Sequence, residues 1–73
     1  MKKKAQVALG KAIRACREEK GFSQEELSYR ANIHRNYIGS LERGERNVGF
    51  QILVVVANAL GMKAYELLKK ADL

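Results

Sequence analysis

The sequence predicts an all-α fold, a single domain built from five helices. Three observations support this prediction. The chain has 73 residues, enough for one compact unit and too few for a second domain or a buried cofactor pocket. Apolar residues recur at helical spacing along most of the chain. There is no proline, so glycines and the apolar spacing mark where one helix ends and the next begins.

The first helix is expected over residues 6–20. Leu9, Ile13 and Cys16 recur there at helical spacing on one face, and charged residues lie largely on the others. Gly21 ends this helix, because glycine adopts the left-handed backbone of a helix C-terminus without steric cost. The pattern is that of an amphipathic helix with one side in the core.

A short second helix and a third follow, separated by a tight turn. Ser23 and Glu26 form a capping-box pattern, in which the serine oxygen accepts from the Glu26 backbone and the glutamate side chain reaches back. The second helix then runs through Ala31. Asn32 falls where a tight turn needs a left-handed backbone, which asparagine tolerates better than most residues. The third helix is expected over residues 34–43.

The third helix has few apolar positions and an unusually polar exterior. Ile38 and Leu41 are its apolar residues, and Gly44 closes the segment. Two short helices joined by a turn of a few residues, the second polar on its outer face, have the geometry of a DNA-binding helix-turn-helix. The second and third helices are therefore a candidate DNA-binding element.

The fourth helix is expected over residues 50–60 and carries two apolar stripes. Gly61 separates it from a fifth helix over residues 63–70. One stripe of the fourth helix suffices to face the core and consists of Phe50, Leu53, Val56, Ala57 and Leu60. The second stripe is left over and consists of Ile52, Val55 and Ala59.

We expect a second copy of the chain to cover the leftover stripe, because the other helices of so small a domain cannot bury both. Tyr65 is assigned to the same dimer interface. The alternative is that the fifth helix folds back over the stripe, with Tyr65 covering it. A homodimer also doubles the length of DNA that the protein contacts.

Four stretches closely resemble the Cro and phage-repressor family of helix-turn-helix domains, namely residues 21–27, 31–33, 37–38 and 41–44. The likeness covers about Leu9 to Leu68. Within that family, residues 41–48 look like the controller proteins of restriction-modification systems. The resemblance implies a lambda-repressor-like fold whose third helix enters the major groove. It also implies a twofold dimer on a pseudo-palindromic operator, with half-sites about 34 Å apart.

The resemblance further implies which residues meet DNA. Base edges fall to Arg35, Asn36 and Ser40, because arginine grips guanine and asparagine grips adenine through two hydrogen bonds, and serine is short enough for either. The alternative is an ordinary solvated polar face. Contacts with the DNA backbone are implied for five further residues, Gln24, Tyr37, Arg43, Arg46 and Asn47. For Gln24 the alternative is exposure to solvent, and for Tyr37 it is core packing.

Three more positions bear on the resemblance. Glu42 matches the family's glutamate that pairs with an arginine of the first helix, here Arg17. Such a pair is worth under about 1 kcal/mol at the surface, whereas deleting one partner of a buried pair costs about 3–5 kcal/mol. His34 stands where the family has a Ser or Thr cap, which leaves an imidazole nitrogen as the available cap. Gly39 costs up to about 1 kcal/mol inside a helix; it either permits a close approach of DNA or another helix, or is tolerated slack.

The charge balance points to a polyanionic partner. Fourteen Lys and Arg against eight Asp and Glu leave a net charge of +6 and a pI near 9.8. Double-stranded DNA is the leading candidate and an anionic membrane is less favoured, because the basic residues are spread along the chain rather than gathered on one helix face. Residues 1–5 are predicted to be a flexible basic tail, ahead of a DNA-binding domain over residues 6–71.

Composition argues against other classes of function. A single cysteine, Cys16, cannot form an internal disulfide, and a lone His34 cannot build a metal site. No acid, base and nucleophile set can be assembled, so we expect no enzyme, cofactor or metal. The longest apolar run, residues 52–57, is too short to cross a membrane, and the N-terminus lacks a signal-peptide pattern. A cytoplasmic location is therefore expected.

The sequence thus predicts a homodimeric, sequence-specific transcriptional regulator of double-stranded DNA. No small-molecule effector is expected, so the input is the protein's own concentration, and regulation of its own promoter follows naturally. The alternative is an antitoxin-like or adaptor module whose apolar fourth helix docks on a different protein.

Overall fold

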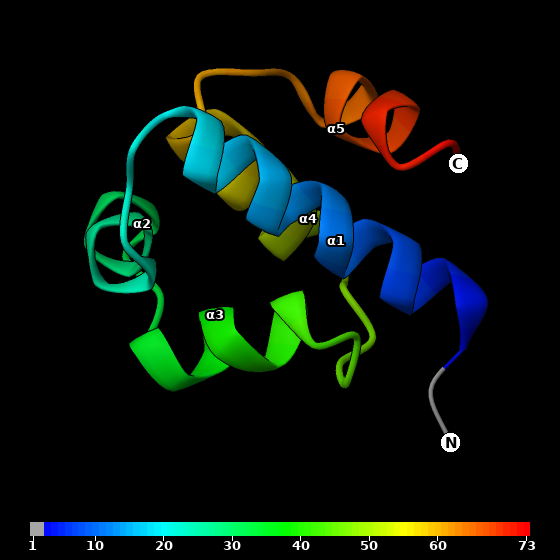
Figure 1. Cartoon of the computed structure of the whole chain (residues 1–73), viewed down its shortest axis with the longest axis horizontal. Helices are drawn as coiled ribbons and strands as arrows, with labels where there is room; N and C mark the ends of the chain where they lie inside the picture. The colour runs from blue at the N-terminus through cyan, green and yellow to red at the C-terminus, as the bar shows by residue number, and fades with distance from the viewer. Residues whose placement is uncertain (1–2) are drawn as a thin grey trace.

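The computed structural model describes residues 3–73, and in that part of the chain it contains helices and no strands (Figure 1). The all-α prediction with five helices is confirmed. The helices are α1 (Lys4–Glu19), α2 (Gln24–Ala31), α3 (Arg35–Glu42), α4 (Phe50–Ala59) and α5 (Ala64–Lys70). Most of their ends lie within a residue of the positions that the sequence predicts.

The start of α1 is the exception, because it begins two residues earlier than predicted. Lys4 and Ala5 are helical, so they were wrongly assigned to the basic tail; Met1 and Lys2 lie outside the described residues. Lys3 is the extended N-cap, and its backbone N–H donates to the side-chain oxygen of Gln6. Lysine and alanine also favour helical backbone, so nothing in the sequence delays the helix to residue 6.

The turn between α2 and α3 is built as predicted at one position and differently at another. Asn32 adopts the left-handed backbone, with φ of 56°. Ser23 caps α2, since its hydroxyl oxygen accepts from the Glu26 backbone at 2.9 Å. The Glu26 carboxylate does not complete a capping box; it accepts instead from Nε of Arg30 at 2.7 Å. The opposite charge one turn further along the helix competes successfully for this carboxylate.

The core lies between α1 and the other four helices. α1 packs on α3 and α5, α2 packs on α3 and α4, and α4 packs on α5 (Figure 1). The fully buried side chains of the core are Ile13, Leu27, Ile38, Leu41, Val56, Leu60 and Leu67. Cys16 belongs to this cluster, as expected of a small core residue, and burial raises the pKa of its thiol.

The core stripe of α4 is shorter than predicted. Val56, Ala57 and Leu60 are buried and Leu53 is partly buried, but Phe50 is 78 % exposed. Phe50 is the first residue of α4, one to two turns ahead of the residues that enter the core. The prediction that Phe50 belongs to the core is therefore wrong, because its end of the helix projects beyond the packed part.

Candidate nucleic-acid interface

α2, the turn at Asn32 and α3 form the helix-turn-helix. Three residues separate the two helices, and the backbone N–H of Ile33 donates to the Ser28 carbonyl at 3.0 Å, which closes the turn. His34 caps α3 through Nδ1, which accepts from the Asn36 backbone at 3.1 Å. The imidazole nitrogen thus takes the place of a hydroxyl cap and satisfies one of the free N–H groups at the start of the helix.

A buried ion pair ties the end of α3 to α1. Nε of Arg17 lies 2.6 Å from Oε2 of Glu42, and Nη2 lies 3.1 Å from Oε1. The two side chains are 10 % and 3 % exposed, which answers the question of burial that the sequence leaves open. The third guanidinium nitrogen donates to the Phe22 carbonyl at 2.8 Å. The hydrogen bonds with Glu42 raise the pKa of Arg17 above its ordinary value.

Gln24 joins this buried network instead of pointing freely into solvent. It is the first residue of α2, and its Nε2 donates to Oε1 of Glu42 at 3.0 Å. The carboxylate of Glu42 therefore receives hydrogen bonds from both α1 and α2. The amide nitrogen of Gln24 keeps a second hydrogen for an outside acceptor.

Two glycines make room around this network, and sequence reasoning considered only one of them. A Cβ at Gly39 would meet Nη1 of Arg43 at 3.1 Å and Oε1 of Gln24 at 3.6 Å, so the glycine gives space to these two side chains. A Cβ at Gly10 would meet the Leu41 carbonyl oxygen and lie 2.6 Å from that of Glu42. Gly10 therefore permits the close contact of α1 with α3. The available signal was an isolated glycine inside a helical pattern.

The side of α3 that faces away from the core presents Arg35 and Asn36 to solvent. Nη1 of Arg35 lies 3.4 Å from Oε2 of Glu25, and both side chains are mostly exposed. Such a pair contributes little to stability, so the guanidinium is available for another acceptor. Two of the three residues that were expected to contact base edges are thus free to do so.

The third, Ser40, is buried, and the prediction that it contacts base edges is not supported by this conformation. Ser40 is 6 % exposed. Its hydroxyl donates to the Tyr37 carbonyl at 2.8 Å and accepts from Nε of Arg46 at 3.2 Å. One helical turn after Asn36, Ser40 has the correct phase to face DNA, but the loop that follows α3 brings Arg46 against it. The sequence alone did not reveal this covering contact.

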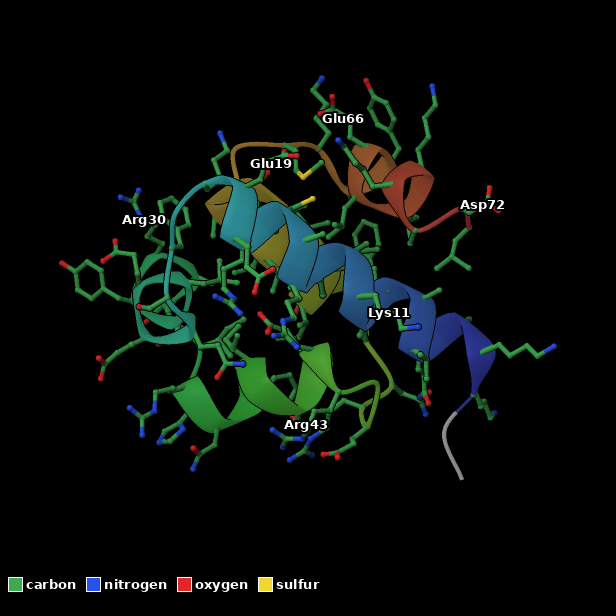
Figure 2. The ribbon with its side chains drawn as sticks, viewed as in Figure 1. Lys11, Glu19, Arg30, Arg43, Glu66 and Asp72 are labelled. Carbon is green, nitrogen blue, oxygen red and sulfur yellow. The ribbon has the colours of Figure 1, made fainter. Side chains whose placement is uncertain are left out.

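Three of the five residues expected at the DNA backbone, Arg43, Arg46 and Asn47, lie at or after the C-terminal end of α3. Arg43 is exposed, and its Nε lies 3.1 Å from Oε2 of Glu45; Figure 2 shows Arg43 on the side of α3 away from α1. Arg46 lies over the Tyr37 ring, 4.9 Å from its centroid. Oδ1 of Asn47 accepts from Nε2 of Gln6 on α1.

For Tyr37 the sequence left two roles open, a contact with the DNA backbone and packing in the core. Its side chain is half-buried and packs against the hydrophobic core, so core packing is present.

A hollow opens between the start of α2 and the outer face of α3. It is lined by Arg17, Ser23, Gln24, Glu25, Arg35, Asn36, Gly39 and Arg43. The hollow is therefore polar and rich in arginine.

A second exposed feature is the apolar outer side of α4 and α5. Val55 is 38 % exposed, and Ile52 and Ala59 are half-buried. α5 packs on α4, and Tyr65 is 65 % exposed. Within residues 3–73 no single helix is long and apolar enough to cross a membrane; only α4 and α5 taken together meet that test, with a bend of 87° between them.

The two residues with the strongest ligand or nucleophile chemistry have structural roles. Nδ1 of His34 caps a helix, and the Cys16 thiol is buried in the core. No group of three or more His, Cys, Asp or Glu side chains in the described part of the chain is placed to hold a metal ion. The exposed arginines of α3 and of the loop after it are suited to binding an anionic surface.

Comparisons with known proteins agree with this geometry. A family model described as Helix-turn-helix (HTH_3) matches residues 13–67. The chain is 40 % identical over 65 residues to the control protein C.SmaI of Serratia marcescens, covering 89 % of this chain and 77 % of that protein. The restriction-modification controller protein C.AhdI from Aeromonas hydrophila superposes with a TM-score of 0.83 at 39 % identity, covering 85 % of this chain and 94 % of that one.

A further solved structure contains DNA. The restriction-modification controller protein C.Esp1396I, as a tetramer in complex with its natural 35-base-pair operator, superposes with a TM-score of 0.82 at 31 % identity. The match covers 92 % of each chain. The helix-turn-helix described above therefore occurs, in the same fold, in a protein crystallised on operator DNA.

Proposed function

The chain belongs to the helix-turn-helix family of transcriptional regulators, and on this premise we propose that it acts as a homodimer on a pseudo-palindromic DNA operator, as a controller of the restriction-modification type. One observation carries the proposal. The exposed side of α3 presents Arg35 and Asn36, with Arg43 and Arg46 at its end, while a buried ion pair holds the inner side of the helix. A polar, arginine-rich helix held rigidly on a small scaffold suits the major groove of DNA.

The roles divide by position on α3. Arg35 and Asn36 lie at the N-terminal end of the helix, where a helix-turn-helix inserts most deeply, and they contact base edges. Arg43 lies at the other end of α3, Arg46 and Asn47 lie in the loop, and all three contact phosphates, together with Tyr37 near the start of α3 and the amide of Gln24. The phosphate contacts set the register of the protein on the duplex, and the base contacts set its sequence preference.

The dimer interface consists of apolar residues of α4 and α5 that are exposed or half-buried. It comprises Ile52, Val55, Ala59 and Tyr65, and we add the exposed Phe50 to it. Burial of apolar surface is worth about 25 cal/mol per Å² before the cost of association. A twofold pair formed through this surface doubles the number of base pairs that are contacted, which short domains need for useful specificity.

Regulation in this proposal depends on protein concentration, because two copies must associate before both DNA-binding helices can engage an operator. Dimerisation and operator binding then respond together to the amount of protein. Control of the protein's own promoter is the natural outcome. Binding to operator DNA would place the protein in the cytoplasm of its host.

The DNA-binding part is tested by affinity at physiological salt. Duplexes that bind the protein are selected from a random pool, and the best of them is compared with a scrambled duplex of the same composition. We expect the selected duplex to bind at least about 1000-fold more tightly, as specific DNA-binding proteins do. Equal affinities would refute sequence-specific binding.

The dimer is tested by measuring the mass of the protein in solution. We expect a homodimer for the wild-type protein and a monomer for Val55→Glu, because a charge is placed in the centre of the apolar stripe. Lys11→Glu, on the exposed surface of α1, is the matched control and should remain dimeric. A wild-type monomer would contradict the proposal and favour the adaptor alternative.

A further inference from the structure

Ser40 lies at the centre of a short series of polar contacts at the end of α3. Its hydroxyl hydrogen is directed at the Tyr37 carbonyl oxygen, 2.8 Å away. A hydroxyl has one hydrogen to donate, so its oxygen serves Arg46 as an acceptor, at 3.2 Å from Nε. The hydrogen bond to the helix backbone thereby fixes the direction from which Ser40 accepts.

Arg46 is held on a second side by an aromatic ring. Its guanidinium carbon lies 4.9 Å from the centroid of the Tyr37 ring, within the range of a cation–π contact. Neither contact uses the two terminal nitrogens of the guanidinium, and the residue is exposed overall. The Nε edge and one face of the Arg46 guanidinium are therefore held in place. The two terminal nitrogens, which can donate a pair of hydrogen bonds to a phosphate, remain available.

We propose that Ser40 is a positioning residue, which acts on DNA by holding Arg46 ready for a phosphate and not by contacting a base edge. The proposal rests on the proposed DNA-binding function. A mobile arginine side chain on the protein surface loses conformational entropy when it binds a phosphate. A side chain that is already held in one conformation loses less. Ser40 therefore contributes to affinity for every duplex equally, because phosphates carry no sequence information.

The first test is a cycle of variants measured on DNA. Ser40→Ala should weaken binding about 3- to 10-fold, and by the same factor for the selected and the scrambled duplex. Arg46→Ala should weaken binding more, and Ser40→Ala should add no further loss when Arg46 is already alanine. The matched control is Ser28→Ala, because the Ser28 hydroxyl makes the same contact with a carbonyl three residues earlier, at 2.7 Å, but serves no arginine.

Two results would overturn the proposal. One is a change of preference at a single base pair in Ser40→Ala, with unchanged affinity for the scrambled duplex, because this is the behaviour of a base contact. The other is an equal loss whether or not Arg46 is present. The Ser28→Ala control should bind DNA as the wild type does.

The second test needs no DNA and no variant. Relaxation of the side-chain ¹⁵Nε signal in the free wild-type protein should show Arg46 to be more ordered than Arg35, whose Nη1 contact with Glu25 is long and exposed. Equal mobility of the two arginines would refute the positioning role even if Ser40→Ala fails to fold. This result is independent of DNA specificity, so it separates failure of this inference from failure of the proposed function.

Discussion

Each side of α3 carries one arginine–glutamate ion pair, and the two pairs differ in length and burial. On the inner side, Arg17 and Glu42 are 2.6 Å apart with side chains 10 % and 3 % exposed. On the outer side, Arg35 and Glu25 are 3.4 Å apart with side chains 60 % and 76 % exposed. The inner pair is fixed by further hydrogen bonds from Gln24 and to the Phe22 carbonyl, and the outer pair has little to hold it.

The difference shows that one ion pair fixes the orientation of α3, whereas the other leaves an arginine available for a new partner. A buried pair has lost its water, so removing one partner leaves an unsatisfied charge, and α3 is locked in orientation. An exposed pair is screened and weak, so Arg35 can exchange a carboxylate for DNA at little cost. A DNA-binding helix of this kind needs both, because an arginine can select a base only if its backbone does not move.

The largest effect is expected from Glu42→Ala. The substitution leaves Arg17 buried without its carboxylate and should lower the free energy of unfolding by about 3–5 kcal/mol. Chemical denaturation measures the change. The control is Glu18→Ala, which removes the exposed partner of Arg14 and should cost under about 1 kcal/mol. Similar costs for the two variants would show that the inner pair is not special.

Gly10→Ala should come next. Its Cβ would collide with the backbone of α3, 2.6 Å from the Glu42 carbonyl oxygen, and backbone atoms cannot rotate away. We expect a loss of about 1–3 kcal/mol, despite alanine's higher helix propensity, and weaker DNA binding because α3 must shift. Gly49→Ala, where nothing lies within 4 Å of the added carbon, is the comparison. An unchanged melting temperature for Gly10→Ala would contradict the close contact of α1 with α3.

On the outer side, Arg35→Ala should alter DNA binding and leave folding intact. We expect a loss of about 1–3 kcal/mol that is confined to one base pair of each half-site, measured by competition with single-substitution duplexes. Arg14→Ala, a distant exposed arginine that is paired with Glu18, should bind every duplex as the wild type does. A uniform loss over all duplexes would assign Arg35 to phosphate contact.

The smallest effect is expected from Glu25→Gln. Loss of the exposed carboxylate should change the free energy of unfolding by less than about 0.5 kcal/mol, because the pair with Arg35 is long and mostly exposed. Thermal melting at low and high salt is the measurement, and little dependence on salt is expected. A loss comparable to that of Glu42→Ala would remove the distinction between the two sides.

The sequence was a good guide to the helices because local signals agree with the packing. Ser23 caps a helix and Asn32 takes the left-handed turn, and both residue types have local chemical reasons to be there. Phe50 was assigned to the core from helical periodicity, which specifies a face but not where along the helix the packing stops. That information depends on the length and placement of the other helices.

Within the candidate site, the family resemblance implied which residues form an ion pair, and the structure showed how buried they are and what else they contact. The Arg17–Glu42 pair was implied by a family pattern, but its burial depends on how α1, α2 and α3 meet. Ser40 has the correct helical phase for DNA, and only the fold of the following loop places Arg46 over it. Gly10 went unnoticed, because a glycine that permits a close helix contact looks the same in sequence as one that is merely tolerated.

The central claim is that a dimer presents two rigid copies of α3 to successive turns of DNA, and the spacing of the half-sites tests it most directly. Duplexes selected from a random pool should converge on a pseudo-palindrome with half-site centres about one helical turn, roughly 34 Å, apart. Inserting half a turn between the half-sites should reduce affinity to that of scrambled DNA. A selected pool with a single unpaired motif, or affinity that is indifferent to the insertion, would contradict the account.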